Sequence, residues 1–106
     1  MVRADGRIIF LNVEDVDWIE ADDKYVRLHV GRVSHMARQT LAAVEEQLDP
    51  ERFLRIHRSA VVNVGRIREL QPLFSGEYRV VLEGGAALTL SRNYKDRLFR
   101  LLGRPL

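Results

Sequence analysis

FLRIHRSAVVN, residues 53–63, consists of two apolar runs with a polar segment between them. Its apolar parts, residues 53–56 and 60–62, are typical of buried strands, and a run of hydrogen-bonding side chains separates them. In one continuous strand, His57 and Ser59 would point to one side and Arg58 to the other, because side chains alternate along a strand. The stretch therefore predicts two buried strands that meet at a polar junction.

Working outward, the apolar pattern predicts strands on both sides of this stretch. Residues 24–30 alternate most clearly, and a polar turn would join them as a hairpin to residues 15–20. Residues 7–12 are predicted as a buried strand because they form a short apolar run. Further strands are expected at residues 33–38, 67–70, 78–82 and 86–90, with glycine-containing turns between the last three.

Two helices interrupt the strand pattern. Thr40 can cap a helix in which Leu41, Val44, Glu45 and Leu48 recur at helical spacing, and Asp49-Pro50 would end it. A second helix would begin after Ser91 and end at Gly103, with Tyr94, Leu98 and Leu101 on one face. The sequence thus predicts a mainly β fold with one short internal helix and a C-terminal helix.

Length and composition indicate one globular domain over residues 1–106. The chain has 46% hydrophobic and 30% charged residues, as an ordinary soluble domain does. It has no cysteine, which excludes disulfides, thiolate metal sites and cysteine nucleophiles and fits a reducing compartment. No apolar run approaches the roughly 18 residues of a membrane span. We therefore expect a cytoplasmic location and no contact with a membrane.

The basic residues are almost all arginine. The chain has 17 lysine and arginine residues, and only Lys24 and Lys95 are lysine, which leaves 15 arginines. The planar guanidinium group matches phosphate oxygens and the edge of guanine, so this bias favours a nucleic-acid partner. A GC-rich genome would produce the same bias, so the positions of the arginines must decide between the two explanations.

Side chains suited to binding gather at three junctions. The first is residues 55–59, where Arg58 could be only a solvated cation and where His57 and Ser59 could hold the local backbone. In the second, Ser91 would place Arg92 in the first turn of a helix. Free backbone N–H groups in that turn favour an anion. Because a cation there opposes the helix dipole, Arg92 is better explained as a contact to a negatively charged partner than as a stabiliser of the helix. The third is the polar tip at residues 22–25, which any hairpin could have.

Four segments, in this order along the chain, resemble the motifs of LytTR DNA-binding domains. The segments are Asp15-Val16-Asp17-Trp18-Ile19-Glu20-Ala21, Gln39-Thr40-Leu41, Phe53-Leu54-Arg55-Ile56-His57-Arg58-Ser59 with Val62-Asn63, and Leu90-Ser91-Arg92-Asn93-Tyr94-Lys95. The match runs from about Arg7 to Leu101. The resemblance implies an elongated arrangement of mostly antiparallel sheets that inserts loops into successive grooves of double-stranded DNA.

The resemblance also assigns roles to individual residues. The family's two base-reading positions fall on Arg58, beside His57, and on Arg92. The DNA-contacting hairpin of the family falls on Lys24 or Tyr25, and Asn93, Tyr94 and Lys95 would meet the sugar-phosphate backbone. Asn63 is interpreted as structural, because it follows a buried strand and can secure backbone groups.

At the level of the whole protein, the resemblance implies a bacterial transcription regulator of a two-component system. Such a response regulator usually carries a receiver or sensor domain, which this chain lacks. A dimer on repeated DNA half-sites is a further expectation, and no cofactor is implied.

Two other classes of protein were weighed against DNA binding. A hydrolase would use His57, Ser59 and an aspartate, but no Gly-x-Ser-x-Gly motif surrounds Ser59. The three histidines, His29, His35 and His57, lack the paired spacing of a metal site. A β module that receives a peptide strand at an open sheet edge stays possible, although it leaves Arg92 unexplained.

Overall fold

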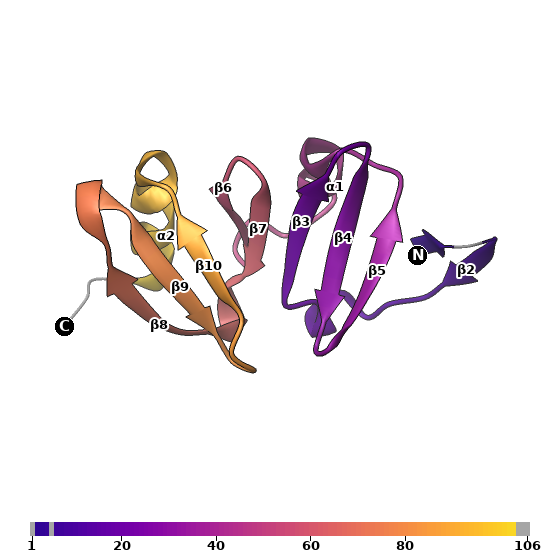
Figure 1. Ribbon diagram of the computed structural model, residues 1–106, viewed down its shortest axis with the longest axis horizontal. Coiled ribbons are helices and arrows are strands. Elements are labelled where there is room, and N and C mark those ends of the chain that lie inside the picture. Colours follow the sequence, from indigo (N-terminus) through magenta and orange to yellow (C-terminus); the bar gives the residue numbers. More distant parts are fainter. Residues whose placement is uncertain (1, 5, 104–106) are drawn as a thin grey trace.

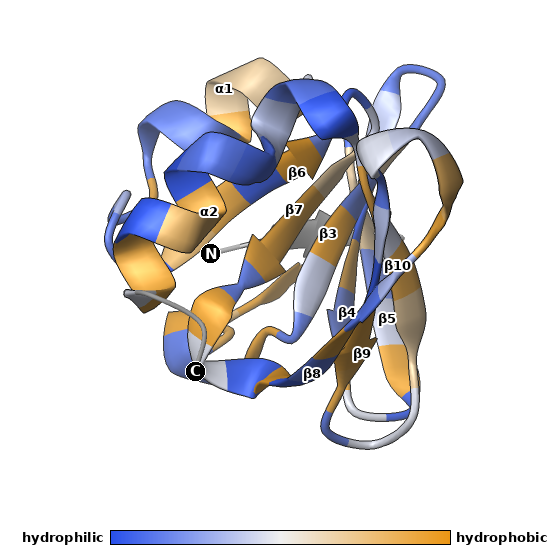
Figure 2. Cartoon of the chain, turned by 90° about the vertical axis from the view of Figure 1, so that its left-hand side faces the viewer, coloured by the Kyte–Doolittle hydropathy of each residue, from blue (hydrophilic) through white to orange (hydrophobic). Residues whose placement is uncertain are grey.

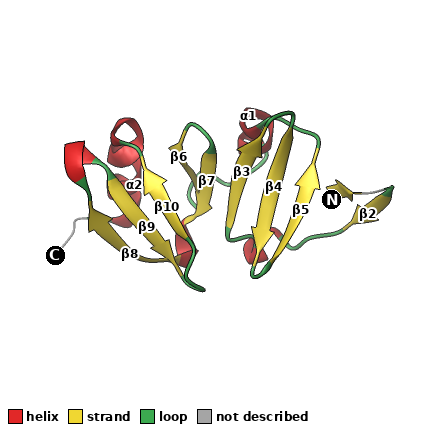
Figure 3. Cartoon of the chain, viewed as in Figure 1, coloured by secondary structure: helices red, strands yellow, loops and turns green. Residues whose placement is uncertain are grey.

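The computed structural model describes residues 2–4 and 6–103, which form an elongated, mainly β molecule of 46 × 23 × 21 Å (Figure 1). The strands are β1 (Val2–Ala4), β2 (Arg7–Ile9), β3 (Trp18–Asp22), β4 (Tyr25–Val30), β5 (Val33–Ala37), β6 (Phe53–His57), β7 (Ala60–Asn63), β8 (Ile67–Pro72), β9 (Tyr78–Leu82) and β10 (Ala87–Leu90). The α-helices are α1 (Leu41–Glu46) and α2 (Lys95–Leu102). Short 3-10 turns are η1 (Val13–Asp15), η2 (Val64–Arg66), η3 (Phe74–Gly76) and η4 (Arg92–Tyr94) (Figure 3). The predicted fold class is confirmed.

The strands form three antiparallel sheets. The largest has the order β5-β4-β3-β7-β6, the second has the order β10-β9-β8, and β1 pairs with β2 in a separate ribbon. The predicted β3–β4 hairpin is present, and Val26, Leu28 and Val30 of β4 all face one core. The two larger sheets meet where the Ser91 N–H donates to the Ile56 carbonyl at 2.8 Å.

The β6–β7 hairpin is the wall shared by two hydrophobic cores. Because side chains alternate along a strand, Val61 enters the first core while its neighbours Ala60 and Val62 enter the second. Likewise, Phe53 belongs to the first core and Leu54 to the second. The stretch quoted at the outset therefore joins both halves of the molecule.

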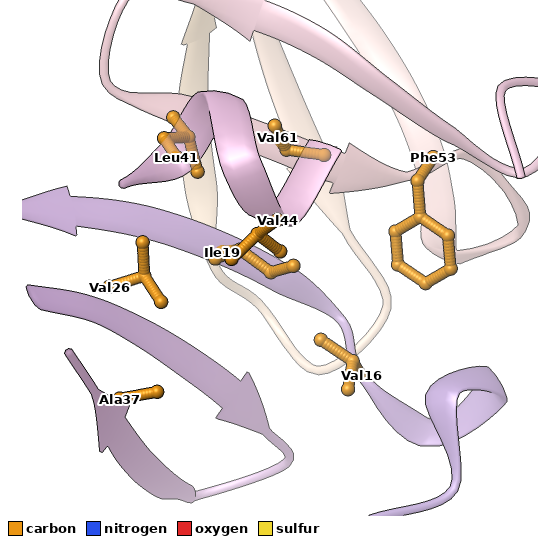
Figure 4. Packing of buried hydrophobic residues seen from close by; sticks show 8 residues of the cluster. All are labelled: Val16, Ile19, Val26, Ala37, Leu41, Val44, Phe53 and Val61. Carbon is orange, nitrogen blue, oxygen red and sulfur yellow. The ribbon is translucent and has the colours of Figure 1, made fainter. Parts of the chain in front are cut away.

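The first core lies between the large sheet and α1 (Figure 4). Its buried members are Val16, Ile19, Val26, Ala37, Leu41, Val44, Phe53 and Val61. The second core lies between β6, β7, the three-stranded sheet and α2. Its buried members are Leu54, Ile56, Ala60, Val62, Val80, Leu82, Leu90 and Leu98.

Each helix covers one of these cores. The Thr40 hydroxyl accepts a hydrogen bond from the Ala43 N–H at 3.1 Å, which confirms the predicted cap of α1. Leu98 of α2 is fully buried, and Gly103 ends this helix with a φ of +82°. Figure 2 shows α2 mostly hydrophilic on its outer side, above the hydrophobic β6 and β7. Within the described part of the chain, neither helix has the length and apolar character of a membrane span.

The prediction of a buried strand at residues 7–12 is wrong. Only Arg7–Ile9 form a strand, in the β1–β2 ribbon at one end of the molecule (Figure 1). Ile8 is 52% exposed and Phe10 is 81% exposed. Residues 7–12 are mostly apolar, but β2 pairs with β1 and not with the large sheet. Most of these side chains therefore have no hydrophobic core to pack into.

The predicted strand at residues 15–20 begins later, at Trp18. The Asn12 side chain accepts a hydrogen bond from the Glu14 N–H at 3.2 Å and caps η1, which includes Asp15. This local hydrogen bond favours a turn where the sequence pattern alone predicted extended backbone.

Candidate nucleic-acid interface

The three predicted site regions lie along one long edge of the molecule, at the top of Figure 1. This upper edge consists of the β3–β4 turn, the β6–β7 turn, the β8–β9 loop and the junction between β10 and α2. Backbone hydrogen bonds join its parts, because the Ala21 N–H donates to the Ser59 carbonyl at 2.9 Å and the Ser91 N–H donates to the Ile56 carbonyl. Segments 35 to 38 residues apart in the sequence are thereby neighbours.

Four cations are available on the upper edge. Lys24, Arg58 and Arg92 are exposed, and Lys95 is half-buried. None of the four forms an ion pair with another described residue. Each of these four side chains can therefore meet an anion without first breaking an ion pair, and the exposed acids Asp23 and Asp96 adjoin Lys24 and Lys95 in the sequence.

The β6–β7 turn exposes Arg58 at its tip. His57 pairs with Ala60, so Arg58 and Ser59 alone make the turn, and the register shifts by one residue at Ile56, which forms a bulge. The predicted interruption of two buried strands is confirmed. Because the turn has only these two residues, the Arg58 side chain can project from it in few directions.

His57 has a defined tautomer in its neutral form. Its Nδ1 accepts a hydrogen bond from the Ser59 N–H at 3.2 Å and lies 2.9 Å from the Ser59 hydroxyl oxygen. Because an amide N–H can only donate, Nδ1 carries no hydrogen, and the hydrogen is on Nε2. His57 and Ser59 therefore hold the local backbone, and Nε2–H stays available as a donor.

Arg55 supports the β6–β7 turn, a role that the sequence analysis missed. Its Nε donates to the His57 carbonyl at 2.9 Å, and its guanidinium group also donates to the Arg58 carbonyl. Nη1 forms an ion pair of 3.0 Å with Glu45 of α1. The signal was present in the sequence, because Glu45 lies on the apolar stripe of its helix and a charge in that position needs a partner.

The junction between β10 and α2 differs from its prediction. Arg92 and Asn93 are exposed, but they lie in η4 and not in the first turn of α2, and the Ser91 side chain forms no cap hydrogen bond. The bond from Ser91 to Ile56 keeps the chain attached to the large sheet through residue 91, so the α-helix begins only at Lys95. The first turn of α2 contains the acidic Asp96.

Tyr94 differs in character from its neighbours in this junction. It is half-buried and packs against the second core, whereas Arg92 and Asn93 point their side chains into solvent. Its ring therefore helps to fix η4 on the molecule.

The β8–β9 loop lies directly against Arg92. The Gly76 position is 3.6 Å from the Arg92 Cδ atom and 3.8 Å from the Lys95 Nζ atom, measured from an ideal Cβ. In the sequence, Ser75-Gly76 indicated only a turn. This loop is a fourth part of the upper edge, and Phe74 at its apex is 93% exposed.

The tip of the β3–β4 hairpin carries Lys24 and Tyr25. Asp23 adopts a φ of +56°, a conformation that aspartate tolerates better than most residues. The Asp22 carboxylate pairs with Arg27 at 2.9 Å, so this acid is already neutralised next to Lys24. Tyr25 is 38% exposed at the same tip.

On the opposite, lower edge, Arg52 and Arg66 are paired with acids, whereas Arg32 in the β4–β5 turn is exposed and forms no ion pair with another described residue. Arg52 binds Glu14 at 3.2 Å, and Arg66 binds Asp17 at 3.4 Å and Asp15 at 3.9 Å. The Asp17 carboxylate also accepts from the Gly31 N–H at 2.8 Å. The acidic segment at the start of β3 thus belongs to a structural network.

Asn63 has the structural role that was predicted. It is buried, its Nδ2 donates to the Val16 carbonyl at 2.9 Å and to the Glu14 carbonyl at 3.3 Å, and its Oδ1 accepts from the Gly65 N–H at 3.0 Å. Asn63 thereby joins β7, η1 and η2.

The contacts of His57 differ from those of a hydrolase triad. Its Nδ1 is occupied within its own turn, and no hydrogen bond or ion pair among the described residues joins the ring to a carboxylate. In that same part of the chain, no three histidine, cysteine or acidic side chains gather as metal ligands.

Comparison with known protein families gives one match over most of the chain. The model of the LytTr DNA-binding domain matches residues 6–103. The chain is 32% identical over 95 residues to the sensory transduction protein LytT of Bacillus anthracis, which covers 90% of this chain and 39% of the relative. It is 28% identical over 93 residues to the transcriptional regulatory protein LytR of Staphylococcus aureus, covering 88% of this chain and 38% of the relative. The chain thus spans about two fifths of the length of these relatives.

A solved structure shares the fold. The LytTr DNA-binding domain of a Bacillus cereus response regulator superimposes with a TM-score of 0.86 at 24% sequence identity, covering 96% of this chain and 94% of the other.

Proposed function

Because this chain belongs to the LytTR family of DNA-binding domains, we propose that it binds duplex DNA with a sequence preference through its upper edge. The observation that carries the proposal is the gathering of four cations at the loops of the upper edge. Lys24, Arg58, Arg92 and Lys95 have no acidic partner in the described chain, while on the lower edge Arg52 and Arg66 are paired and Arg32 is not. Cations without a protein partner can neutralise phosphates without first losing an ion pair.

Arg58 and Arg92 are the two base-reading residues in this proposal. Both are exposed, and both leave a short backbone connection that is hydrogen-bonded on either side. A guanidinium group held in this way can donate two hydrogen bonds to O6 and N7 of guanine in the major groove. Because the guanidinium group is already partly positioned in the free protein, less conformational entropy is lost when DNA binds.

The other upper-edge residues set the position of the domain on DNA. Asn93 and Lys95 contact the sugar-phosphate backbone beside Arg92. The hydroxyl group of Tyr94 contacts the same backbone, while its ring stays packed against the second core. Lys24 and Tyr25 contact DNA from the β3–β4 tip. His57 donates from Nε2–H to a phosphate or a base next to Arg58.

The length of the molecule fits a site that covers successive major grooves. Equivalent faces of B-DNA recur about every 34 Å, and the long dimension of the domain is 46 Å. Loops distributed along that dimension can enter neighbouring grooves without a recognition helix. The junction between β10 and α2 and the β3–β4 turn lie on either side of the β6–β7 turn (Figure 1).

The peptide-binding alternative has less support. The large sheet has β5 and β6 at its edges, but β1 packs beside β5, and β10 approaches β6 through the Ser91 to Ile56 hydrogen bond. A peptide strand at either edge of the large sheet would therefore have to compete with elements of the protein.

Selection from a pool of random duplexes, followed by a salt series on the selected site, tests the proposed function. We expect one enriched motif, with affinity that falls steeply as salt rises, because phosphate contacts release counterions. Equal recovery of all sequences would contradict sequence preference, and negligible DNA binding even at low salt would contradict DNA binding itself.

For the whole protein, we propose a transcription regulator in which this domain acts beside a receiver or sensor domain. The support is that the relatives named above are sensory transduction and transcriptional regulatory proteins longer than this chain. A cytoplasmic location and a dimer on repeated half-sites follow from the same proposal.

A further inference from the structure

Phe74 is the most exposed of the large hydrophobic residues in the described chain, at 93%. It occupies the apex of the β8–β9 loop, outside both hydrophobic cores. Isolated apolar side chains on a protein surface are common, so exposure alone would carry no meaning. What distinguishes Phe74 is its surroundings.

The loop holds Phe74 in a defined position. The Leu73 N–H donates to the Glu77 carbonyl at 2.8 Å and closes the loop at its base. Ser75 adopts a φ of +64° and Gly76 a φ of +80°, so the backbone folds back directly after Phe74. A left-handed serine is uncommon and costs some free energy. The tight turn that follows keeps the ring pointing away from the protein.

The same loop touches the proposed base-reading arginine. Gly76 lies against the aliphatic part of Arg92 and near the Lys95 ammonium group, with an ideal Cβ at 3.6 Å and 3.8 Å from the nearest atom of each. Only Ser75 separates Phe74 from Gly76 along the chain. The upper edge therefore offers an arginine and, next to it, an apolar ring.

We propose that Phe74 reads a thymine beside the base pair read by Arg92, by packing its ring on the thymine methyl group in the major groove. The inference rests on the proposed function and deepens it. In the major groove, the methyl group is the apolar feature that distinguishes thymine, and an apolar side chain is its usual partner. Ring and methyl group would then both leave water on binding.

Deoxyuridine provides the sharpest test, because it differs from thymidine only by the missing methyl group. With the selected duplex, replacement of one thymine next to the Arg92-dependent position should weaken wild-type binding about fourfold, the value of one buried methyl group. The same replacement should leave the affinity of Phe74→Ala unchanged. Phe74→Ala itself should bind the thymine site about tenfold more weakly than wild type, and Phe74→Leu should keep part of the preference.

Phe10→Ala is the matched control. Phe10 is also exposed, at 81%, but it follows β2 at the opposite end of the molecule, so its removal should not change DNA affinity. Thermal unfolding of Phe74→Ala should match wild type, because the ring leaves no cavity.

The outcomes separate this inference from the proposed function. If wild type selects a site but uracil replacement has no effect at any thymine, or affects wild type and Phe74→Ala equally, the role of Phe74 is refuted while DNA recognition stands. If wild type selects no site, the proposed function fails first.

Discussion

Arg92 and Lys95 lie in the same short segment, yet their side chains can do different work on DNA. Arg92 is exposed in η4, and its aliphatic part lies beside Gly76. Lys95 is half-buried at the start of α2. A planar fork can select a base, whereas a flexible ammonium group neutralises a phosphate in any sequence.

Arg92→Lys should therefore keep most nonspecific DNA binding and lose roughly 1–3 kcal/mol of discrimination at one base pair. Arg92→Ala should lose both the discrimination and part of the nonspecific affinity. The measurement is a titration of each variant with the selected site and with its single-base substitutions at fixed salt. Full retention of the preference by Arg92→Lys would make Arg92 a phosphate contact and leave base reading to Arg58.

Asn63 gives the corresponding prediction for stability. Asn63→Ala should lower the free energy of unfolding by roughly 1–3 kcal/mol, because the buried Val16 carbonyl loses its donor. Asn63→Asp should not restore stability, since a carboxylate cannot donate to that carbonyl. Urea unfolding measures both variants, and a stability of Asn63→Ala equal to wild type would contradict the structural role.

At the scale of elements, the β6–β7 turn depends on Arg55, whose side chain is half-buried. Arg55 joins the carbonyls of His57 and Arg58 to Glu45 of α1. The turn that presents Arg58 is thereby attached to the helix over the first core, so packing of α1 bears on the geometry of the upper edge.

Arg55→Met should weaken specific DNA binding by roughly 0.5–2 kcal/mol, although Arg55 makes no DNA contact in this account. Glu45→Gln is the matched variant, because it keeps an oxygen acceptor for Arg55 while removing the charge, and it should cost less. Affinities for the selected site, compared at equal folded fractions, provide the test. Unchanged affinity in Arg55→Met would show that the turn does not need this support.

Sequence reasoning succeeded for elements whose partners could be inferred locally and failed where they could not. The alternation of β4 and the Thr40 cap are local signals, and both predictions are confirmed. Residues 7–12 have the composition of a buried strand, but composition does not reveal that β2 lies outside the large sheet.

Within the site, the resemblance indicated Arg58 and Arg92 but neither Arg55 nor Phe74. Their importance arises from contacts between distant segments, such as Gly76 with Arg92, which neither spacing nor periodicity predicts.

At the scale of the whole molecule, the two long edges should differ in their electrostatic contribution to binding. Lys95→Ala should weaken binding to all sequences similarly and reduce the salt dependence by about one phosphate contact. Arg52→Ala should change neither the affinity for DNA nor its salt dependence, because Arg52 lies on the lower edge and pairs with Glu14. Salt series on the selected duplex compare the variants. If the salt dependence of binding decreased equally in Lys95→Ala and Arg52→Ala, the overall charge of the domain, and not the upper edge, would determine binding.

The central claim is that DNA lies along the upper edge, and amide chemical-shift mapping by NMR tests it most directly. On titration with the selected duplex, the account predicts the largest shifts at residues 22–25, 57–60, 73–77 and 91–96. Amides on the lower edge, at residues 13–17, 31–33, 64–66 and 83–85, should shift little. The largest shifts at the lower-edge segments, with the upper edge unperturbed, would contradict the account.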